Sequence, residues 1–265
     1  MNHAISGLRQ FMQRYPVLKR AGRRILSFVQ GASVSDKYKK LEGQDIAVEA
    51  CNLRDAWRND DLPERQRRLV DSQLIAYRNG DSNAVFDSFV EVIRTLNHSE
   101  CMRLLEVGCS SGYYSEVLAL RGVGVEYHGC DYSIGFVDLA RRIYPSLSFE
   151  VADAANLPYI DKSFDVVVSG CCLLHIPEYE SAIAETARVA KKWAVFHRTP
   201  VLHNSATQYF TKEAYGVKTL EIHFNESEIV RLFSKYGLNV VDIRTIAVDW
   251  TGGDVFASKT YLCMK

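Results

Sequence analysis

A row of small residues interrupts the apolar stretch LLEVGCSSGYYSEVL at residues 104–118. The five residues GCSSG, 108–112, lie between an apolar run and an amphipathic one, as in a tight turn between a strand and a helix. Such a turn lets backbone N–H groups come close to a bound ligand. A nucleotide phosphate, a different cofactor and a tight turn without a ligand are three interpretations that the stretch alone leaves open.

The spacing of the glycines excludes the two common phosphate-binding loops. A dinucleotide-binding turn needs G-x-G-x-x-G, whereas here three residues separate Gly108 from Gly112. A Walker loop needs Gly-Lys-Ser or Gly-Lys-Thr, which this stretch lacks. A cofactor other than a phosphate-anchored dinucleotide or nucleoside triphosphate is therefore favoured.

Short apolar runs alternate with amphipathic segments from residue 101 to residue 265, as they do in βαβ units. Strands are expected near 103–107, 125–130, 147–151, 164–169, 192–198, 238–246 and 257–264, and helices near 112–121, 134–144, 178–190 and 225–237. The last two strands follow each other without a helix, so we expect them to be antiparallel. The pattern predicts an α/β fold with a Rossmann-like, seven-stranded doubly wound sheet that binds its ligand at the carboxyl ends of the strands.

Four motifs occur in a fixed order along this segment: LLEVGCSSG, GCDYS, VADAANLPY and FDVVVSGCCLLHI. Together they resemble the motifs of a class I S-adenosylmethionine-dependent methyltransferase of the small-molecule type. The resemblance is strong over about 100–200 and extends in general topology to residue 265. One departure is Ser110, which stands where the family's first motif has its second glycine; serine is small and keeps the backbone N–H, so we expect it to be tolerated.

The resemblance implies S-adenosylmethionine as the cofactor. Asp131 would accept hydrogen bonds from both ribose hydroxyls, because a carboxylate has two acceptor oxygens, and it is also placed to cap the next helix. Asp153 and Ala154 resemble the pair that meets the adenine amino group, and Tyr132 would flank the ring. The full set of expected cofactor-binding residues is Glu106, Gly108, Cys109, Ser110, Gly112, Tyr113, Asp131, Tyr132, Asp153, Ala154 and Gly170.

Two histidines are candidates for a catalytic base. Methyl transfer needs a base only where the acceptor atom must lose a proton, as a sugar hydroxyl must. His175 follows the fourth strand and His197 closes the fifth. A structural or cofactor-lining role for His175, and a hydrogen-bonded strand-end position for His197, are the competing interpretations. Tyr113 would cover the cofactor or touch the acceptor.

Composition excludes several classes of protein. Lysine and arginine together number 32, and so do aspartate and glutamate. The chain as a whole is therefore not an electrostatic binder of nucleic acid. The seven cysteines include no C-x-x-C pair, which indicates reduced thiols in a cytoplasmic protein. No metal site is predicted, because Cys171, Cys172 and His175 lack a second pair of ligands at matching spacing.

The chain divides into three parts. Residues 1–35 form a basic amphipathic N-terminal segment with six lysine or arginine side chains and no acidic one, residues 36–100 a helical lid or extension, and residues 101–265 the methyltransferase domain. The first segment is expected to pack on the rest of the protein, to touch anionic lipid or a charged partner, or to be a disordered tail. The second interpretation would make a cytoplasmic protein peripheral to a membrane.

The acceptor is inferred by elimination. The N-P-P-Y type motif for amide or adenine nitrogen is absent after the fourth strand, and no RNA-binding module is found in 101–265. The leading hypothesis is therefore O- or N-methylation of a small-molecule, glycan or lipid-linked acceptor. A macromolecular methyltransferase acting on RNA or protein, and a non-catalytic binding module that keeps the fold, are the alternatives.

Overall fold

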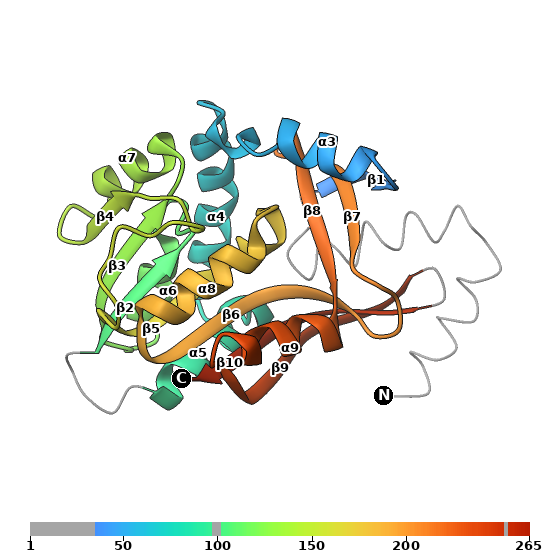
Figure 1. Cartoon of the computed structure of the whole chain (residues 1–265). Coiled ribbons are helices and arrows are strands. Elements are labelled where there is room, and N and C mark those ends of the chain that lie inside the picture. Colours follow the sequence, from blue (N-terminus) through green and yellow to red (C-terminus); the bar gives the residue numbers. More distant parts are fainter. Residues whose placement is uncertain (1–34, 97–101, 252–253) are drawn as a thin grey trace, which may run out of the picture. The chain divides into compact units, whose positions relative to one another are not determined.

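The computed structural model describes residues 35–96, 102–251 and 254–265 (Figure 1). The strands are β1 (Ser35–Leu41), β2 (Arg103–Val107), β3 (Glu126–Asp131), β4 (Ser148–Val151), β5 (Phe164–Gly170), β6 (Ala190–Leu202), β7 (Gln208–Ala214), β8 (Val217–Asn225), β9 (Asn239–Thr251) and β10 (Asp254–Met264). The helices are α3 (Asp45–Asn52), η1 (Ala56–Arg58), α4 (Leu62–Arg78), α5 (Ala84–Leu96), α6 (Tyr113–Leu120), α7 (Ile134–Ile143), η2 (Leu173–His175), α8 (Tyr179–Val189) and α9 (Glu226–Lys235), where η marks a short 3₁₀ turn. The basic segment predicted at 1–35 lies, apart from its last residue, outside the described residues.

Seven of these strands form the predicted doubly wound sheet, in the order β4-β3-β2-β5-β6-β10-β9. The pairs from β4 to β6 are all parallel, and β10 runs antiparallel to both β6 and β9. The α/β class and the antiparallel last strand predicted from the sequence are therefore confirmed.

Side chains alternate between the two faces of the central strands, as the pleat requires. Leu104 and Val166 pack into one core with the apolar faces of α5, α6 and α7, whereas Leu105 and Val167 pack on the opposite face. Helices α8 and α9 cover the second face, where Phe196 stacks on Phe233 with ring centroids 4.2 Å apart. Burial on both faces explains why β5 carries three consecutive valines, at 166–168.

Local sequence signals account for two of the helix boundaries. Helix α9 begins after Asn225, whose side-chain oxygen accepts a hydrogen bond from the Glu228 N–H at 2.9 Å. Helix α5 begins after Asn83, whose side-chain oxygen accepts from the Val85 N–H at 3.1 Å, and it buries its apolar stripe in the core. Within the described residues, no helix is long and apolar enough to cross a membrane.

Three further strands were not expected from the sequence. β7 and β8 form an antiparallel hairpin, and β1 pairs with β7, so the part predicted as helical at 36–100 begins with a strand (Figure 1). The hairpin turns at Tyr215 and Gly216, both at positive φ, which matches the twist of a two-residue hairpin. Its β8 strand joins the main sheet through the end of β6, where Val201 pairs with Phe224. The described residues thus form ten strands rather than seven.

Candidate active site

The sheet reverses its winding between β2 and β5. From β2 the chain proceeds outward to β3 and β4, and it then returns to place β5 on the other side of β2. Ligands of open α/β sheets bind outside the carboxyl ends of the strands at such a reversal. The loops that follow β2, β3 and β5 meet there, and they carry most of the residues that the sequence singled out.

The loop after β2 leaves no room for side chains at its two glycines. Gly108 and Gly112 both have φ of +72°, a left-handed conformation that glycine adopts without strain. A Cβ atom on Gly108 would overlap the Cys172 side chain, and one on Gly112 would lie 2.7 Å from the Phe149 ring. Side chains are therefore excluded at both positions, as expected where a ligand must approach the backbone closely.

Asp131 ends β3 and faces the same loop. Its carboxylate accepts hydrogen bonds from the Ser110 N–H at 3.0 Å and the Ser133 N–H at 2.9 Å. Burial raises the pKa of Asp131 to about 6, and these backbone donors only partly oppose it. Each carboxylate oxygen keeps a further acceptor position, so the group suits a vicinal diol such as a ribose.

The surroundings of this loop fit the nucleoside and amino-acid parts of S-adenosylmethionine. The Ser111 Oγ atom is buried without a hydrogen-bond partner among the described residues, so a polar ligand group would satisfy it. Gly170 lies directly over the Glu106 carboxyl, where a Cβ atom would clash. Glu106 itself is 1% exposed and hydrogen-bonded to the Tyr127 hydroxyl, and burial raises its pKa well above the ordinary value.

Cys109 lies below the loop rather than in the crevice. Its side chain is fully buried, and its thiol would lie 2.8 Å from a Cβ atom on Gly129 of β3. Burial raises its pKa well above the ordinary value, so the thiol stays neutral. Its side chain is therefore not available to a cofactor, and its backbone N–H donates to the Cys130 carbonyl at 3.0 Å.

A segment that we call the lid segment, Arg54–Arg58, covers the residues predicted to hold adenine. The Arg54 guanidinium lies 3.0 Å from an Asp153 oxygen and 3.2 Å from a Glu178 oxygen. The Trp57 N–H donates to the Tyr132 hydroxyl at 3.0 Å, and this hydroxyl donates to the Arg54 carbonyl at 3.1 Å. The predicted adenine residues therefore lie together, beneath backbone and side chains of the lid segment.

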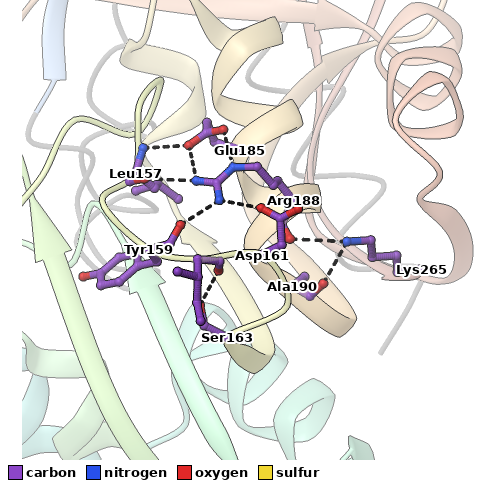
Figure 2. A network of polar contacts seen from close by, with 9 residues as sticks. Leu157, Tyr159, Asp161, Ser163, Glu185, Arg188, Ala190 and Lys265 are labelled. Carbon is purple, nitrogen blue, oxygen red and sulfur yellow. Dashed lines mark hydrogen bonds and ion pairs between the residues drawn. The ribbon is translucent and has the colours of Figure 1, made fainter.

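An arginine on α8 fixes the loop that carries Asp153 and Ala154. Figure 2 shows the Arg188 guanidinium between that loop and the helix. It donates to the Leu157 carbonyl at 3.0 Å and the Tyr159 carbonyl at 2.7 Å, and it pairs with Glu185 at 2.7 Å. Residues 157–161 of the loop are thereby tied to α8.

His175 is fixed in one tautomer next to the lid segment. Its Nδ1 lies 2.6 Å from the Leu220 carbonyl oxygen, so Nδ1 carries the hydrogen and Nε2 carries the lone pair. Its ring centroid is 4.7 Å from that of Trp57. Burial, followed by the positive charge of Lys212, lowers the pKa of His175 to about 3. The imidazole is therefore neutral near pH 7, and its Nε2 has no hydrogen-bond partner among the residues that the structure describes.

His197 lies in the core, away from the crevice. It is 1% exposed, its Nδ1 lies 2.8 Å from the Thr260 hydroxyl, and its Nε2 lies 3.0 Å from the Tyr114 hydroxyl. Both ring nitrogens are therefore engaged, and neither is available to an acceptor. This geometry favours the structural interpretation of His197, in which it positions Tyr114 beneath the partly exposed Tyr113.

Sequence reasoning missed three features of the site. Trp57 bridges Tyr132 and His175 from a segment without a recognisable motif. Lys212 and Glu221 form a buried ion pair on the unexpected hairpin, close enough to His175 to shift its pKa. Arg198 follows His197 at the carboxyl end of the parallel part of β6, and a basic residue at the end of a predicted strand was the only signal for it.

Comparison with known proteins supports the resemblance to methyltransferases. Residues 105–196 match the family model described as a methyltransferase domain. The demethylmenaquinone methyltransferase of Paenarthrobacter aurescens is 34% identical over 124 residues, which are 44% of this chain and 48% of that protein. A phthiotriol/phenolphthiotriol dimycocerosates methyltransferase of Mycobacterium ulcerans is 34% identical over 102 residues, 37% of this chain and 38% of that protein. The chain thus spans half or less of the length of these curated relatives.

The fold also matches solved structures. The magnesium protoporphyrin IX methyltransferase of Synechocystis, crystallised with S-adenosylmethionine, aligns with a TM-score of 0.57 at 16% identity, over 82% of this chain and 97% of that one. The didemethyltoxoflavin N1-methyltransferase of Burkholderia thailandensis aligns with a TM-score of 0.51 at 16% identity, over 77% and 90%. These likenesses concern the fold alone. Residues 105–196 thus match a methyltransferase domain in sequence, and the fold of the chain is that of S-adenosylmethionine-dependent methyltransferases of known structure.

Proposed function

We propose that the chain is an S-adenosylmethionine-dependent methyltransferase that methylates an oxygen or nitrogen of a small-molecule acceptor. The observation that carries the proposal is the Asp131 carboxylate, buried at the end of β3 and turned toward the glycine loop. A buried carboxylate with a raised pKa costs stability in the free protein, so its position indicates a ligand that needs it. The relatives named for demethylmenaquinone and phthiotriol support a small-molecule acceptor.

In the proposed reaction, the cofactor supplies a methyl group on a positively charged sulfur, and the acceptor atom displaces that sulfur in line. Such a displacement depends chiefly on holding the two reactants in the right orientation. Asp131 and the backbone of the loop at Gly108 orient the nucleoside, and Asp153 contacts the base. The lid segment lies beside His175 and Asp153, so we expect it to cover the bound reactants.

His175 is the residue that we assign to accept a proton from the acceptor. Its hydrogen bond to the Leu220 carbonyl fixes the ring with the Nε2 lone pair available. An acceptor hydroxyl within hydrogen-bond reach of Nε2 would lose its proton as the methyl–oxygen bond forms. An acceptor that is already deprotonated would need His175 only for orientation.

The proposal is tested by S-adenosylhomocysteine, the product of the cofactor. A ligand that binds only the native state raises the thermal midpoint, by an amount set by its concentration relative to Kd. We expect a rise for the wild type and for Asp138→Ala, which changes an exposed carboxylate on α7. Asp131→Ala should lose most of the rise. No rise for the wild type at millimolar ligand would refute the proposal, and a normal rise for Asp131→Ala would refute the role of that residue.

A further inference from the structure

Strand β6 contains a bulge at the edge of the site. Phe196 pairs with Tyr261 of β10 and Thr199 pairs with Lys259, so two residues of β6, His197 and Arg198, lie opposite one residue of β10. A bulge of this kind bends the strand and redirects a side chain. Arg198 takes up the distortion with φ of +58°, a left-handed conformation that is uncommon for a residue with a side chain.

The bulge lies at the carboxyl end of the parallel part of the sheet, beside the loop that leaves β5. The Cys171 N–H donates to the His197 carbonyl at 3.0 Å, and Cys171 is itself at φ of +62°. A left-handed residue thus follows β5, and a second one lies beside it within β6, at the carboxyl end of the parallel part of the sheet. Backbone strain of this type is maintained where the surrounding structure needs the resulting side-chain position.

The Arg198 guanidinium has no carboxylate partner among the residues that the structure describes, although it is partly buried. Its charged and titratable neighbours are a thiol and phenols, and its pKa is raised first by Cys171 and then by tyrosines, with burial opposing them. These tyrosines are Tyr114, Tyr113 and Tyr215. His175 is also close enough for Arg198 to lower its pKa, but the imidazole is neutral.

Two other shielded arginines among the described residues are paired with carboxylates. Arg67, which is 9% exposed, lies 2.7 Å from an Asp71 oxygen, and Arg188 lies between Glu185 and Asp161. A shielded guanidinium without a counter-ion loses hydration without gaining an ion pair. Since guanidinium groups stay charged in proteins, an anion from outside the chain would complete the arrangement at Arg198.

We propose that Arg198, with the hydroxyl groups of Tyr113 and Tyr215 beside it, binds a carboxylate group of the methyl acceptor. The planar guanidinium suits a carboxylate because it can donate two parallel hydrogen bonds. A single positive charge matches a singly charged anion. Lys212, the other cation near His175, is already paired with Glu221, so a doubly charged phosphate at Arg198 would be only half neutralised. This inference rests on the proposed function, because it names the class of acceptor for the same site.

The carboxylate on the methionine part of the cofactor is the other carboxylate that would suit Arg198. Arg198 is on β6, and β5 separates it from β2 and the glycine loop. Neighbouring strands are about 4.8 Å apart, so the backbone of Arg198 lies about two strand spacings from that of β2, the strand that precedes the glycine loop. This separation favours the acceptor, and the experiment below distinguishes the two sources.

The test uses the full chain saturated with S-adenosylhomocysteine, titrated calorimetrically with acetate and benzoate and with the neutral analogues acetamide and benzamide. We expect at least one carboxylate to bind about tenfold or more tightly than its amide, the effect of one charge-assisted contact. Arg198→Asn should abolish this preference, and Arg198→Lys should keep part of it. Asparagine suits this position because it tolerates left-handed φ. Arg142→Asn, at an exposed arginine on α7, should retain the full preference.

Each contrary result is separately informative. A wild type that binds S-adenosylhomocysteine but shows no preference for either carboxylate would refute the inference and leave the proposed function standing. A preference that persists in Arg198→Asn would also refute it. If Arg198→Asn instead loses affinity for S-adenosylhomocysteine, the arginine holds the cofactor and the inference is wrong. A wild type that fails to bind S-adenosylhomocysteine refutes the proposed function itself.

Discussion

Replacing Asp131 with asparagine should make the free protein more stable while weakening its hold on the cofactor. Burial raises the pKa of Asp131 from 3.8 to about 6. The folded chain therefore holds the proton more tightly than the unfolded chain, and ionisation costs stability as the pH rises through about 6. A shift of about 2 units corresponds to about 3 kcal/mol at alkaline pH, because one unit is worth about 1.4 kcal/mol.

Asparagine is neutral at every pH and avoids this cost. Its single amide oxygen cannot accept from both the Ser110 and the Ser133 N–H groups, so the substitution forfeits one hydrogen bond, worth about 1 kcal/mol. The avoided cost of ionisation and the lost hydrogen bond are about equal near pH 4.5, where the carboxyl of the wild type is still largely protonated. At pH 8 the variant should be more stable by about 2 kcal/mol.

The assay is urea unfolding of the free protein in steps from about pH 4.5 to about pH 8, with the free energy of unfolding compared between Asp131→Asn and the wild type. Groups common to both proteins cancel in the difference. Asp138→Asn serves as the control and should change stability by less than about 0.5 kcal/mol at every pH. The affinity for S-adenosylhomocysteine should fall about ten- to a hundredfold in Asp131→Asn. A stability difference that does not vary with pH would refute the burial argument.

Two further predictions concern the base and the loop that holds adenine. His175→Gln should lower kcat about a hundredfold or more while S-adenosylhomocysteine still binds, because only the proton acceptor is lost; His203→Gln, at an exposed histidine, should leave kcat unchanged in the same steady-state assay. Arg188→Ala should lower the free energy of unfolding by about 1–2 kcal/mol, a figure reduced by partial solvent screening. It should also speed amide hydrogen exchange in the loop after β4, whereas Lys191→Ala, which removes an exposed charge, should leave both measurements unchanged.

The part of the fold that the sequence predicts is the part with a strict hydrophobic period. The central strands are buried on both faces and therefore read as continuous apolar runs, and the helices between them carry their apolar residues at three-to-four spacing. The hairpin of β7 and β8 escaped prediction because it mixes buried charges with apolar residues. Lys212 and Glu221 interrupt the alternation at positions where the structure pairs them.

The candidate site likewise contains residues that the sequence predicts and residues that it does not. The glycine loop, Asp131 and Asp153 lie directly after strands, so their spacing along the chain predicts that they meet at one edge of the sheet. His197 also follows that rule but points into the core, since strand position alone does not say which face a side chain occupies next to a bulge. Trp57 comes from outside the sheet, and only tertiary packing places it beside His175.

The charges around His175 link the two proposals for this site. Without a bound acceptor, the imidazole is a weak base, because burial and the neighbouring cations Lys212 and Arg198 all disfavour its protonated form. A carboxylate bound at Arg198 would offset that cation, whose effect is smaller than those of burial and Lys212, and raise the pKa of His175 by that contribution. Proton acceptance would then improve only when a charged acceptor occupies the crevice. An uncharged acceptor would meet the same imidazole at its lowest basicity, so Arg198 would select acceptors through the strength of the base as well as through binding.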